Sequence, residues 1–336
     1  MNAGSEFGPT NAVTEACRLC RSAGPHQTIA VREMMFGSRE RFEYFTCVAC
    51  DSLQIMHALD GEELARHYPS DYYSYDISTQ PRLLRWLTTR HDRFELHRGG
   101  GLVGAFTAAL PTSVRAGIGD AARVIGQLTL KREMRILDVG CGSGALLDRL
   151  AGAGFNNLLG TDPFLAADSK TPRGVPLMKR YLNEVTGEFD LIMFNHSLEH
   201  VPDPVATLKA ACERLAAEGI CLVRVPTTSS EAWTAYRENW FQIDAPRHIV
   251  IPSRHGMALA ADAVGLTLQK MFDDSSSAQF IASEAYRRDI AMNELKSLRS
   301  LFGMFGAKSM GGWEKRAKRL NRLGRGDQTG FVMRVN

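Results

Sequence analysis

Two pairs of cysteines near the beginning of the chain have the spacing of a metal site. Each pair is a CxxC, and residues 21–46 separate the two pairs. Four thiolates in such pairs can surround Zn²⁺ tetrahedrally, and residues 28–31 and 41–46 alternate like the short strands of a zinc ribbon. The pattern therefore predicts a structural zinc site. Four buried free cysteines are the alternative, and a redox pair is disfavoured because no helix begins at either CxxC. The ligands would be Cys17, Cys20, Cys47 and Cys50.

A glycine-rich turn at residues 140–144 lies between an apolar run, residues 135–139, and a run of helix formers, residues 145–150. A strand, a glycine turn and a helix in that order are typical of a nucleotide site, because the backbone can approach the ligand and the helix offers free N–H groups. The spacing is GxGxG and no Lys-Ser/Thr follows, which excludes a phosphate-binding loop. Asp162 closes the next apolar run, where a partner of ribose hydroxyls is expected.

Polar side chains follow a third apolar run, residues 189–194. They are Asn195, His196, Glu199 and His200. Ligands of open α/β sheets bind beyond the carboxyl ends of the strands, so these residues are expected at a ligand site. A histidine, with an ordinary pKa near 6.5, can accept a proton there. Alternatively, Glu199 and His200 only cap the following turn. A zinc site on His196 and His200 has helical spacing, but Pro202 and the loop context argue against it.

Three ordered motifs resemble class I S-adenosylmethionine-dependent methyltransferases, in particular the bacterial branch with a zinc ribbon that acts on saccharides or small molecules. The motifs are DVGCGSG at 138–144, TDP at 161–163 and FDLIMFNHSLEHVPDP at 189–204. The resemblance extends over residues 124–268. It implies an α/β fold, a Rossmann-like doubly wound and mostly parallel seven-stranded sheet with helices on both faces, preceded by the small zinc ribbon.

The remaining strands of that sheet are expected at residues 176–179, 220–225, 267–272 and 331–335, the last inserted antiparallel as in the family, with a helix at 204–217. The resemblance implies S-adenosyl-L-methionine as the cofactor. Tyr72 or Tyr73 would fold over the cofactor or substrate, unless this tyrosine cluster only fills a domain seam. The cofactor-binding residues would be Asp138, Gly140, Cys141, Gly142, Gly144, Asp162, Pro163, Tyr181, Leu182, Asn195, Tyr72 and Tyr73.

The transferable methyl group of this cofactor is already activated on a cationic sulfur. The enzyme must align a nucleophile, exclude water and, for a hydroxyl acceptor, remove a proton. His196 is the first candidate for the base because it is nearest the strand end, and the other catalytic candidates are His248, Glu199 and His200. The resemblance places an acceptor pocket near His248; its lining would be Trp233, Tyr236, Trp240 and Arg247. The alternative for this region is a lid loop in which Asp244 pairs with Arg247.

Composition limits the class of protein. The chain has 336 residues, is 44% hydrophobic and 23% charged, and carries a net charge of +3, too small to indicate a nucleic acid or a membrane surface as partner. No apolar run approaches the roughly 20 residues of a membrane span. The seven cysteines are an odd number with four in CxxC pairs, which argues against a disulfide framework and for a cytoplasmic location.

We expect four segments. Residues 1–12 read like a cloning leader, 13–62 form the zinc ribbon, 63–130 form a linker and helical segment, and 131–336 form the methyltransferase domain with a helical insertion at 282–325. Within the third segment, helices are expected at 82–98 and 118–128, with a linker marked by glycines at 99–101 and 104. The basic run at 308–325 is either a solvated helix face or a site for a phosphate of the acceptor.

The leading hypothesis is methyl transfer to a small hydroxylated acceptor, such as a saccharide, a nucleotide-sugar or a secondary-metabolite intermediate. C- or N-methylation of a natural-product intermediate is the first alternative. A zinc-ribbon RNA methyltransferase would need a basic groove with aromatic platforms, which the small net charge disfavours. A cofactor-binding module without turnover is disfavoured by the intact glycine turn, Asp162 and the histidines.

Overall fold

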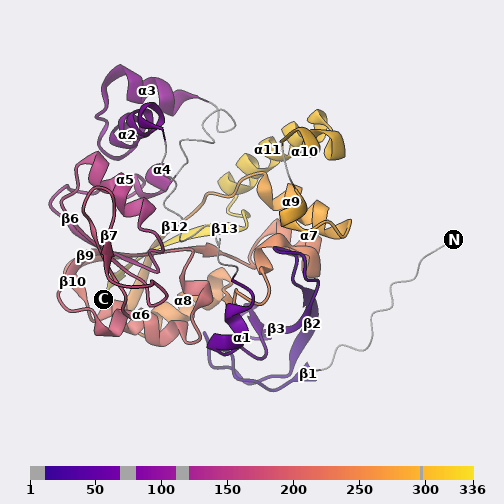
Figure 1. The fold of residues 1–336 in the computed structure, drawn as a ribbon. Coiled ribbons are helices and arrows are strands. Elements are labelled where there is room, and N and C mark those ends of the chain that lie inside the picture. Colours follow the sequence, from indigo (N-terminus) through magenta and orange to yellow (C-terminus); the bar gives the residue numbers. More distant parts are fainter. Residues whose placement is uncertain (1–11, 69–80, 111–120, 296–297) are drawn as a thin grey trace.

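The computed structural model describes residues 12–68, 81–110, 121–295 and 298–336 (Figure 1). Its main feature is an eight-stranded sheet in the order β12-β13-β10-β9-β5-β6-β8-β7. The strands are β5 (Arg135–Val139), β6 (Asn157–Thr161), β7 (Ser169–Lys170), β8 (Pro176–Met178), β9 (Phe189–Asn195), β10 (Leu215–Pro226), β12 (Leu266–Asp273) and β13 (Gln328–Val335).

The central strands of this sheet, β10, β9, β5, β6 and β8, are parallel, whereas β13 is antiparallel to both β10 and β12. The predicted Rossmann-like fold is therefore confirmed, including the inverted last strand. The sheet has an eighth strand that was not predicted. This strand, β7, consists of two exposed polar residues that pair antiparallel with β8, so it carries no apolar signal in the sequence.

Alternate residues of β9 enter two different hydrophobic clusters. Leu191 and Met193 belong to one cluster, and Ile192 and Phe194 belong to the other, because successive side chains of a strand point to opposite faces. The first face is covered by α5 (Ala145–Ala153), behind which pack α2 (Arg82–His97) and α4 (Ala121–Ile125). The second is covered by α6 (Pro204–Cys212) and α8 (Arg254–Asp262). Helices thus lie on both faces, as predicted.

Helix α6 begins at Pro204, where the side chain of Asp203 accepts a hydrogen bond from the N–H of Ala206 at 3.0 Å. The predicted end at residue 217 is wrong, because the helix stops at Cys212. Leu215 pairs with Phe189 and so already belongs to β10. Residues 215–217 favour helix by propensity, and the strand pairing overrides that preference.

The predicted glycine linker at residues 99–101 and 104 is also wrong. Gly100 adopts a φ of 86° between α2 and α3 (Gly101–Ala109), and the two helices pack against each other. A side chain on Gly104 would lie 2.5 Å from the carbonyl oxygen of Arg90, so this glycine permits the close approach of α3 to α2. Helix α2 itself is as predicted. The expected helix at 118–128 is α4, and residues 118–120 lie outside the described part of the chain.

A second, antiparallel sheet carries the cysteine pairs in the segments between its strands. It consists of β1 (Ala12–Val13), β2 (His26–Arg32), β3 (Arg41–Thr46), β4 (Leu53–Ile55) and β11 (Val250–Ile251). Its two longest strands confirm the predicted ones. The fifth strand, β11, lies far from the others in sequence, and it pairs Val250 with Gln54 and Ile251 with Leu53. The small sheet is therefore joined to the loop that precedes α8.

The chain between β12 and β13 is helical. It forms α9 (Ala278–Arg287), α10 (Leu298–Phe305) and α11 (Ala307–Arg322), which lie on the same side of the molecule as the small sheet (Figure 1). Arg39 from the small sheet bonds Asp289 just after α9 at 3.1 Å. On α11, Ala317 and Leu320 are buried, and Arg316 pairs with Glu231 at 2.5 Å. Within the described residues, no helix is long and apolar enough to cross a membrane.

Candidate active site and cysteine cluster

The glycine turn between β5 and α5 packs against the loop after β9. Gly140 and Gly144 have φ angles of 74° and 72°. A side chain on Gly140 would lie 2.4 Å from Cβ of Ser197, which donates a hydrogen bond from Oγ to the carbonyl oxygen of Val139 at 2.5 Å. Only glycine combines this backbone conformation with so close an approach. The turn thus places the first predicted cofactor residues beside the histidine-rich loop.

Two carboxyl groups lie at this turn. Asp162 follows β6 and is buried; its Oδ2 accepts from the N–H of Gly142 at 3.0 Å and its Oδ1 from the N–H of Phe164 at 2.9 Å. Asp138, near the end of β5, is buried too, and burial, reinforced by the charge of Asp162, raises its pKa to about 8. Burial also raises the pKa of the Cys141 thiol, so that this group is an uncharged thiol. A cationic ligand would stabilise the charged form of both carboxylates.

The other predicted cofactor residues have mixed surroundings. Tyr181 is 60% exposed, whereas Leu182, the first residue of the 3₁₀ turn Leu182–Glu184, is buried in the core. Pro163 is half-buried.

Asn195, at the end of β9, contacts an arginine of β10. Its Oδ1 accepts a hydrogen bond from Arg224 at 3.0 Å, and Arg224 forms an ion pair of 2.5 Å with Asp274. Tyr72 and Tyr73 lie outside the described residues. Arg224 was missed by the sequence reasoning, although a single arginine in the apolar run of β10 is a signal.

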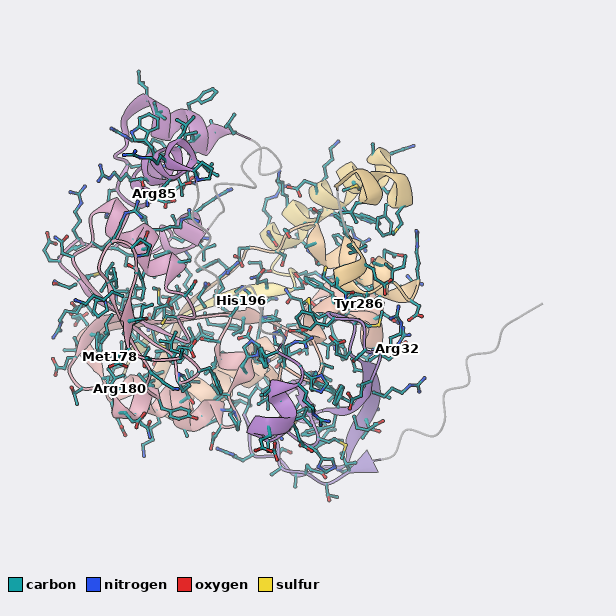
Figure 2. The ribbon with its side chains drawn as sticks, in the orientation of Figure 1. Arg32, Arg85, Met178, Arg180, His196 and Tyr286 are labelled. Carbon is teal, nitrogen blue, oxygen red and sulfur yellow. The ribbon has the colours of Figure 1, made fainter. Side chains whose placement is uncertain are left out.

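His196 follows β9 directly and adopts a φ of 56°, which turns the chain away from the strand. It lies near the centre of the molecule (Figure 2), and its side chain is 34% exposed. Nδ1 lies 3.4 Å from Oε1 of Glu199, and Nε2 contacts the side-chain amide of Gln328 at the start of β13. Nδ1 thus faces the buried carboxylate, and Nε2 faces the side chain of Gln328.

Glu199 is in the 3₁₀ turn Leu198–His200 and is fully buried. Neither carboxylate oxygen has a hydrogen-bond partner of good geometry among the described residues. Burial alone would raise the pKa of Glu199, but the neighbouring His196, His248 and His200 lower it to about 2. The group is therefore an ionised carboxylate surrounded by imidazoles.

Two of those imidazoles are fixed by backbone carbonyls. Nδ1 of His200 lies 2.9 Å from the carbonyl oxygen of Arg247, and Nδ1 of His248 lies 2.8 Å from that of Gln242. The ring centroids are 4.7 Å apart and nearly perpendicular. Nε2 of His248 lies 4.0 Å from Oε1 of Glu199. Burial lowers the pKa of His200, and a charged His248 would lower it further. The structure therefore brings all four predicted catalytic residues together.

The residues predicted to line an acceptor pocket lie in the interior. Trp233, Tyr236 and Trp240 are almost fully buried, and Trp240 donates from Nε1 to Asp327 at 3.2 Å. The side chain of Arg247 is 0% exposed. Its guanidinium donates to Asp244 at 2.6 Å, to Glu33 at 2.9 Å and to the carbonyl oxygen of His67 at 2.9 Å. The bond to Asp244 matches the alternative in which Asp244 pairs with Arg247. The bond to Glu33 connects this pair to the small sheet.

The four N-terminal cysteines form one cluster, with all Sγ atoms within 4.8 Å of one another. Sγ of Cys17 lies 3.6 Å from that of Cys50, and Sγ of Cys20 lies 3.6 Å from that of Cys47. Four thiolates at about 2.3 Å from a tetrahedral zinc would lie about 3.8 Å apart, so these distances fit the ion closely. Nε2 of Gln54 donates to Sγ of Cys17 at 2.9 Å, as suits a thiolate acceptor.

Comparison with known proteins finds similarity in the part of the chain that carries the glycine turn. Residues 115–270 match the family model described as a methyltransferase domain. This part of the chain is thus similar to a methyltransferase domain, in agreement with the motifs of the sequence. The match ends before β13, and it includes neither the cysteine cluster nor the helices α9–α11.

Among curated relatives, the ubiquinone biosynthesis O-methyltransferase of Methylococcus capsulatus is 37% identical over 99 residues, which cover 25% of this chain and 40% of the relative. That of Pseudomonas aeruginosa is 34% identical over 95 residues, with the same shares. The match thus spans about two fifths of these relatives' length. Among solved structures, a cyclopropane synthase of Mycobacterium tuberculosis gives a TM-score of 0.43 at 17% identity, over 76% of this chain and 99% of that one.

Proposed function

We propose that the whole chain is an S-adenosylmethionine-dependent methyltransferase that acts on a hydroxyl group of a small acceptor, with His196 as the base. The observation that carries this proposal is the position of the His196–Glu199 pair: it directly follows β9, and its loop packs on the glycine turn through Ser197 and Gly140. The relatives named as O-methyltransferases support oxygen as the attacked atom.

The cofactor would lie over the glycine turn. Asp138, Gly140, Gly142 and Asp162 are the residues that would hold it, with Asn195, Pro163 and Tyr181 at the margins and Cys141, Gly144 and Leu182 shaping the backbone. When bound, the cofactor supplies a methyl group on a cationic sulfur. Two buried carboxyl groups, Asp138 and Asp162, fit a ligand that carries positive charge and hydroxyl groups. Tyr72 and Tyr73 stay candidates for a cover over this site.

His196 would take the acceptor's proton. Glu199 is an ionised, buried carboxylate at 3.4 Å from Nδ1, so it favours a proton on Nδ1 and leaves the lone pair on Nε2. A hydroxyl at Nε2 would replace the amide of Gln328 and lose its proton to the ring as it attacks. The imidazolium that forms is then stabilised by Glu199. The carboxylate thus orients the base before transfer and balances its charge afterwards.

In this proposal the other predicted residues have supporting roles. His248 and His200 border Glu199 from the inner side, and Arg247 holds the loop that carries His248 through its bonds to Asp244, Glu33 and His67. Trp233, Tyr236 and Trp240 stay candidates for the inner wall of the acceptor site. We also propose that the acceptor is a saccharide, a nucleotide-sugar or a secondary-metabolite intermediate, that the protein is cytoplasmic, and that its segments meet near residues 62 and 130. We also propose that the cysteine cluster holds one structural Zn²⁺, supported by the Sγ distances of 3.6 Å.

The proposal is tested by incubating the full chain with S-adenosyl-L-methionine and a panel of small acceptors, matched in pairs with and without a free hydroxyl, and measuring S-adenosylhomocysteine. We expect turnover only with the hydroxylated member of a pair. Turnover with both members, or with an amine or carbon nucleophile alone, would exclude O-methylation and favour the C- or N-methylation alternative.

A further inference from the structure

A second cluster of metal-ligand types lies apart from the cysteines. It comprises Glu199, His200 and His248, whose ligand atoms all lie within 4.8 Å of one another. Glu199 and His200 are neighbours in the turn after β9, and His248 comes from the loop before β11. Glu199 and His248 are buried and His200 is half-buried. The three groups therefore meet where the large sheet contacts the small one.

The backbone fixes which nitrogen of each ring carries a proton. A carbonyl oxygen only accepts hydrogen bonds, so Nδ1 of His200 donates to Arg247 and Nδ1 of His248 donates to Gln242. In the neutral rings, both Nε2 atoms are then bare lone pairs. This is the arrangement of metal-binding histidines, in which a carbonyl or carboxylate holds the nitrogen that does not bind the metal.

The third group is the carboxylate of Glu199, both of whose oxygens are buried without a hydrogen-bond partner among the described residues. Nδ1 of His196 lies 3.4 Å from Oε1 on the outer side of this carboxylate. On the inner side, a proton on Nε2 of His248 would have to span 4.0 Å to Oε1, beyond hydrogen-bond distance. Two imidazole lone pairs and a carboxylate thus converge on one point without a shared partner among the described residues, and a bound cation would be such a partner.

We propose that Glu199, His200 and His248 bind a divalent transition-metal ion. Two imidazoles and one carboxylate suit Zn²⁺, Mn²⁺, Fe²⁺ or Co²⁺ rather than Ca²⁺ or Mg²⁺, which prefer oxygen ligands. Ligand atoms at about 2.0–2.2 Å from a tetrahedral ion lie about 3.4 Å apart. Oε1 of Glu199 and Nε2 of His248, now 4.0 Å apart, would therefore approach by about 0.6 Å. Such a three-ligand site leaves a coordination position open. This site is separate from the cysteine cluster; it shares Glu199 with the proposed base pair, and its test measures metal binding rather than turnover.

The experiment measures Co²⁺ binding to the full chain after chelation. We expect two equivalents in the wild-type protein. Glu199→Gln keeps the size of the side chain but removes the anion, and we expect it to lose one equivalent or to weaken it more than about hundredfold. Cys17→Ser should lose the other. The absorption spectra separate the two sites, because only thiolates give sulfur-to-metal charge-transfer bands, and these should persist in Glu199→Gln.

His255→Asn, a change of an exposed imidazole on α8, is the matched control and should keep both equivalents. His248→Asn provides a second variant in case Glu199→Gln fails to fold, and circular dichroism reports folding for each. A wild-type protein that binds one equivalent, lost entirely in Cys17→Ser, overturns the proposal. So does a folded Glu199→Gln or His248→Asn variant with the wild-type stoichiometry and spectrum.

Discussion

Oδ2 of Asp162 accepts a hydrogen bond from the backbone N–H of Gly142, 3.0 Å away, so the carboxylate after β6 holds the turn after β5 in shape. This residue was expected to bind ribose hydroxyls only. The contact gives it a second task, because the same buried group orders the glycine turn before any ligand arrives. Preorganisation of this kind lowers the entropy cost of binding.

Asp162→Ala should therefore weaken both the cofactor complex and the free protein. A hydrogen bond to a charged group contributes about 1.5–3 kcal/mol, so we expect S-adenosylhomocysteine to bind about ten- to hundredfold more weakly by calorimetry. Thermal unfolding of the free protein should also move to lower temperature. Asp162→Asn is the control, since its amide oxygen can still accept from Gly142. Equal affinity of the alanine variant and the wild type would exclude the ribose role.

The pKa of Asp138 predicts how stability depends on pH. Its value in the folded chain is about 8, well above the ordinary value of 3.8, because burial disfavours the charge. Between about pH 4 and pH 8 the folded chain therefore keeps a proton that the unfolded chain has lost. This contribution to stability is complete below pH 4 and is lost as the pH rises through 8.

Asp138→Asn should flatten that dependence, as measured by denaturant unfolding of the ligand-free protein at a series of pH values. Glu199, whose pKa is lowered to about 2, acts in the opposite sense: its contribution is present above pH 4.5 and is lost as the pH falls towards 2. Because Glu199 is present in both proteins, its contribution cancels in the difference in unfolding free energy between Asp138→Asn and the wild type. Parallel stability curves for the two proteins between pH 5 and pH 8 would show that Asp138 is ionised when folded.

The base is tested by replacing histidines. His196→Ala should lower kcat by about 10²–10⁴-fold and leave the affinity for S-adenosylhomocysteine nearly unchanged. The acid limb of the pH–rate profile should shift or vanish. A residue that only positions the acceptor would cost less and leave that limb in place. If neither His196→Ala nor His248→Ala slows turnover beyond about tenfold, the proton leaves by another route and the O-methylation proposal falls.

Cys17→Ser should remove the metal of the cysteine cluster. Metal analysis after mild chelation should then show about one equivalent of zinc less than in the wild type, and the small sheet should unfold at lower temperature. Cys212→Ser, outside the cluster and partly exposed, is the control and should change neither quantity. An unchanged zinc content in Cys17→Ser would contradict the assignment of the ligands.

Arg247 allows a sharp comparison of buried and exposed ion pairs. Its side chain is 0% exposed and pairs with both Asp244 and Glu33, so Arg247→Met leaves two buried carboxylates without their cation. We expect a loss of about 3–5 kcal/mol in the free energy of unfolding. Arg21→Met removes a pair with Asp203 at the surface and should cost less than about 1 kcal/mol. Similar losses in the two variants would show that the buried network contributes no more than a surface pair.

Local patterns predicted the parts of the site that local structure builds. The order of strand, glycine turn and helix predicted residues 135–150, and the apolar run before His196 predicted the position of the histidine-rich loop. The position of Gln328 beside His196 could not be predicted from the sequence, because β13 follows the helices α9–α11 and lies far from His196 along the chain. Glu33, likewise, lies 214 residues from Arg247. Arg247 was expected in a pocket lining or in a lid loop paired with Asp244, and its burial against the small sheet could not be predicted because Glu33 is distant in sequence.

The pairing of β4 with β11 makes the boundary at residue 62 a poor place to divide the chain. A fragment that starts after it would leave Val250 and Ile251 as an unpaired strand edge and would remove Tyr44, whose hydroxyl donates to the carbonyl oxygen of His248 at 2.9 Å. The loop that carries His248 would lose its support. The N-terminal segment is thus an internal scaffold for the loop of His248, and removal of the proposed zinc would disturb the histidine cluster through this backbone connection.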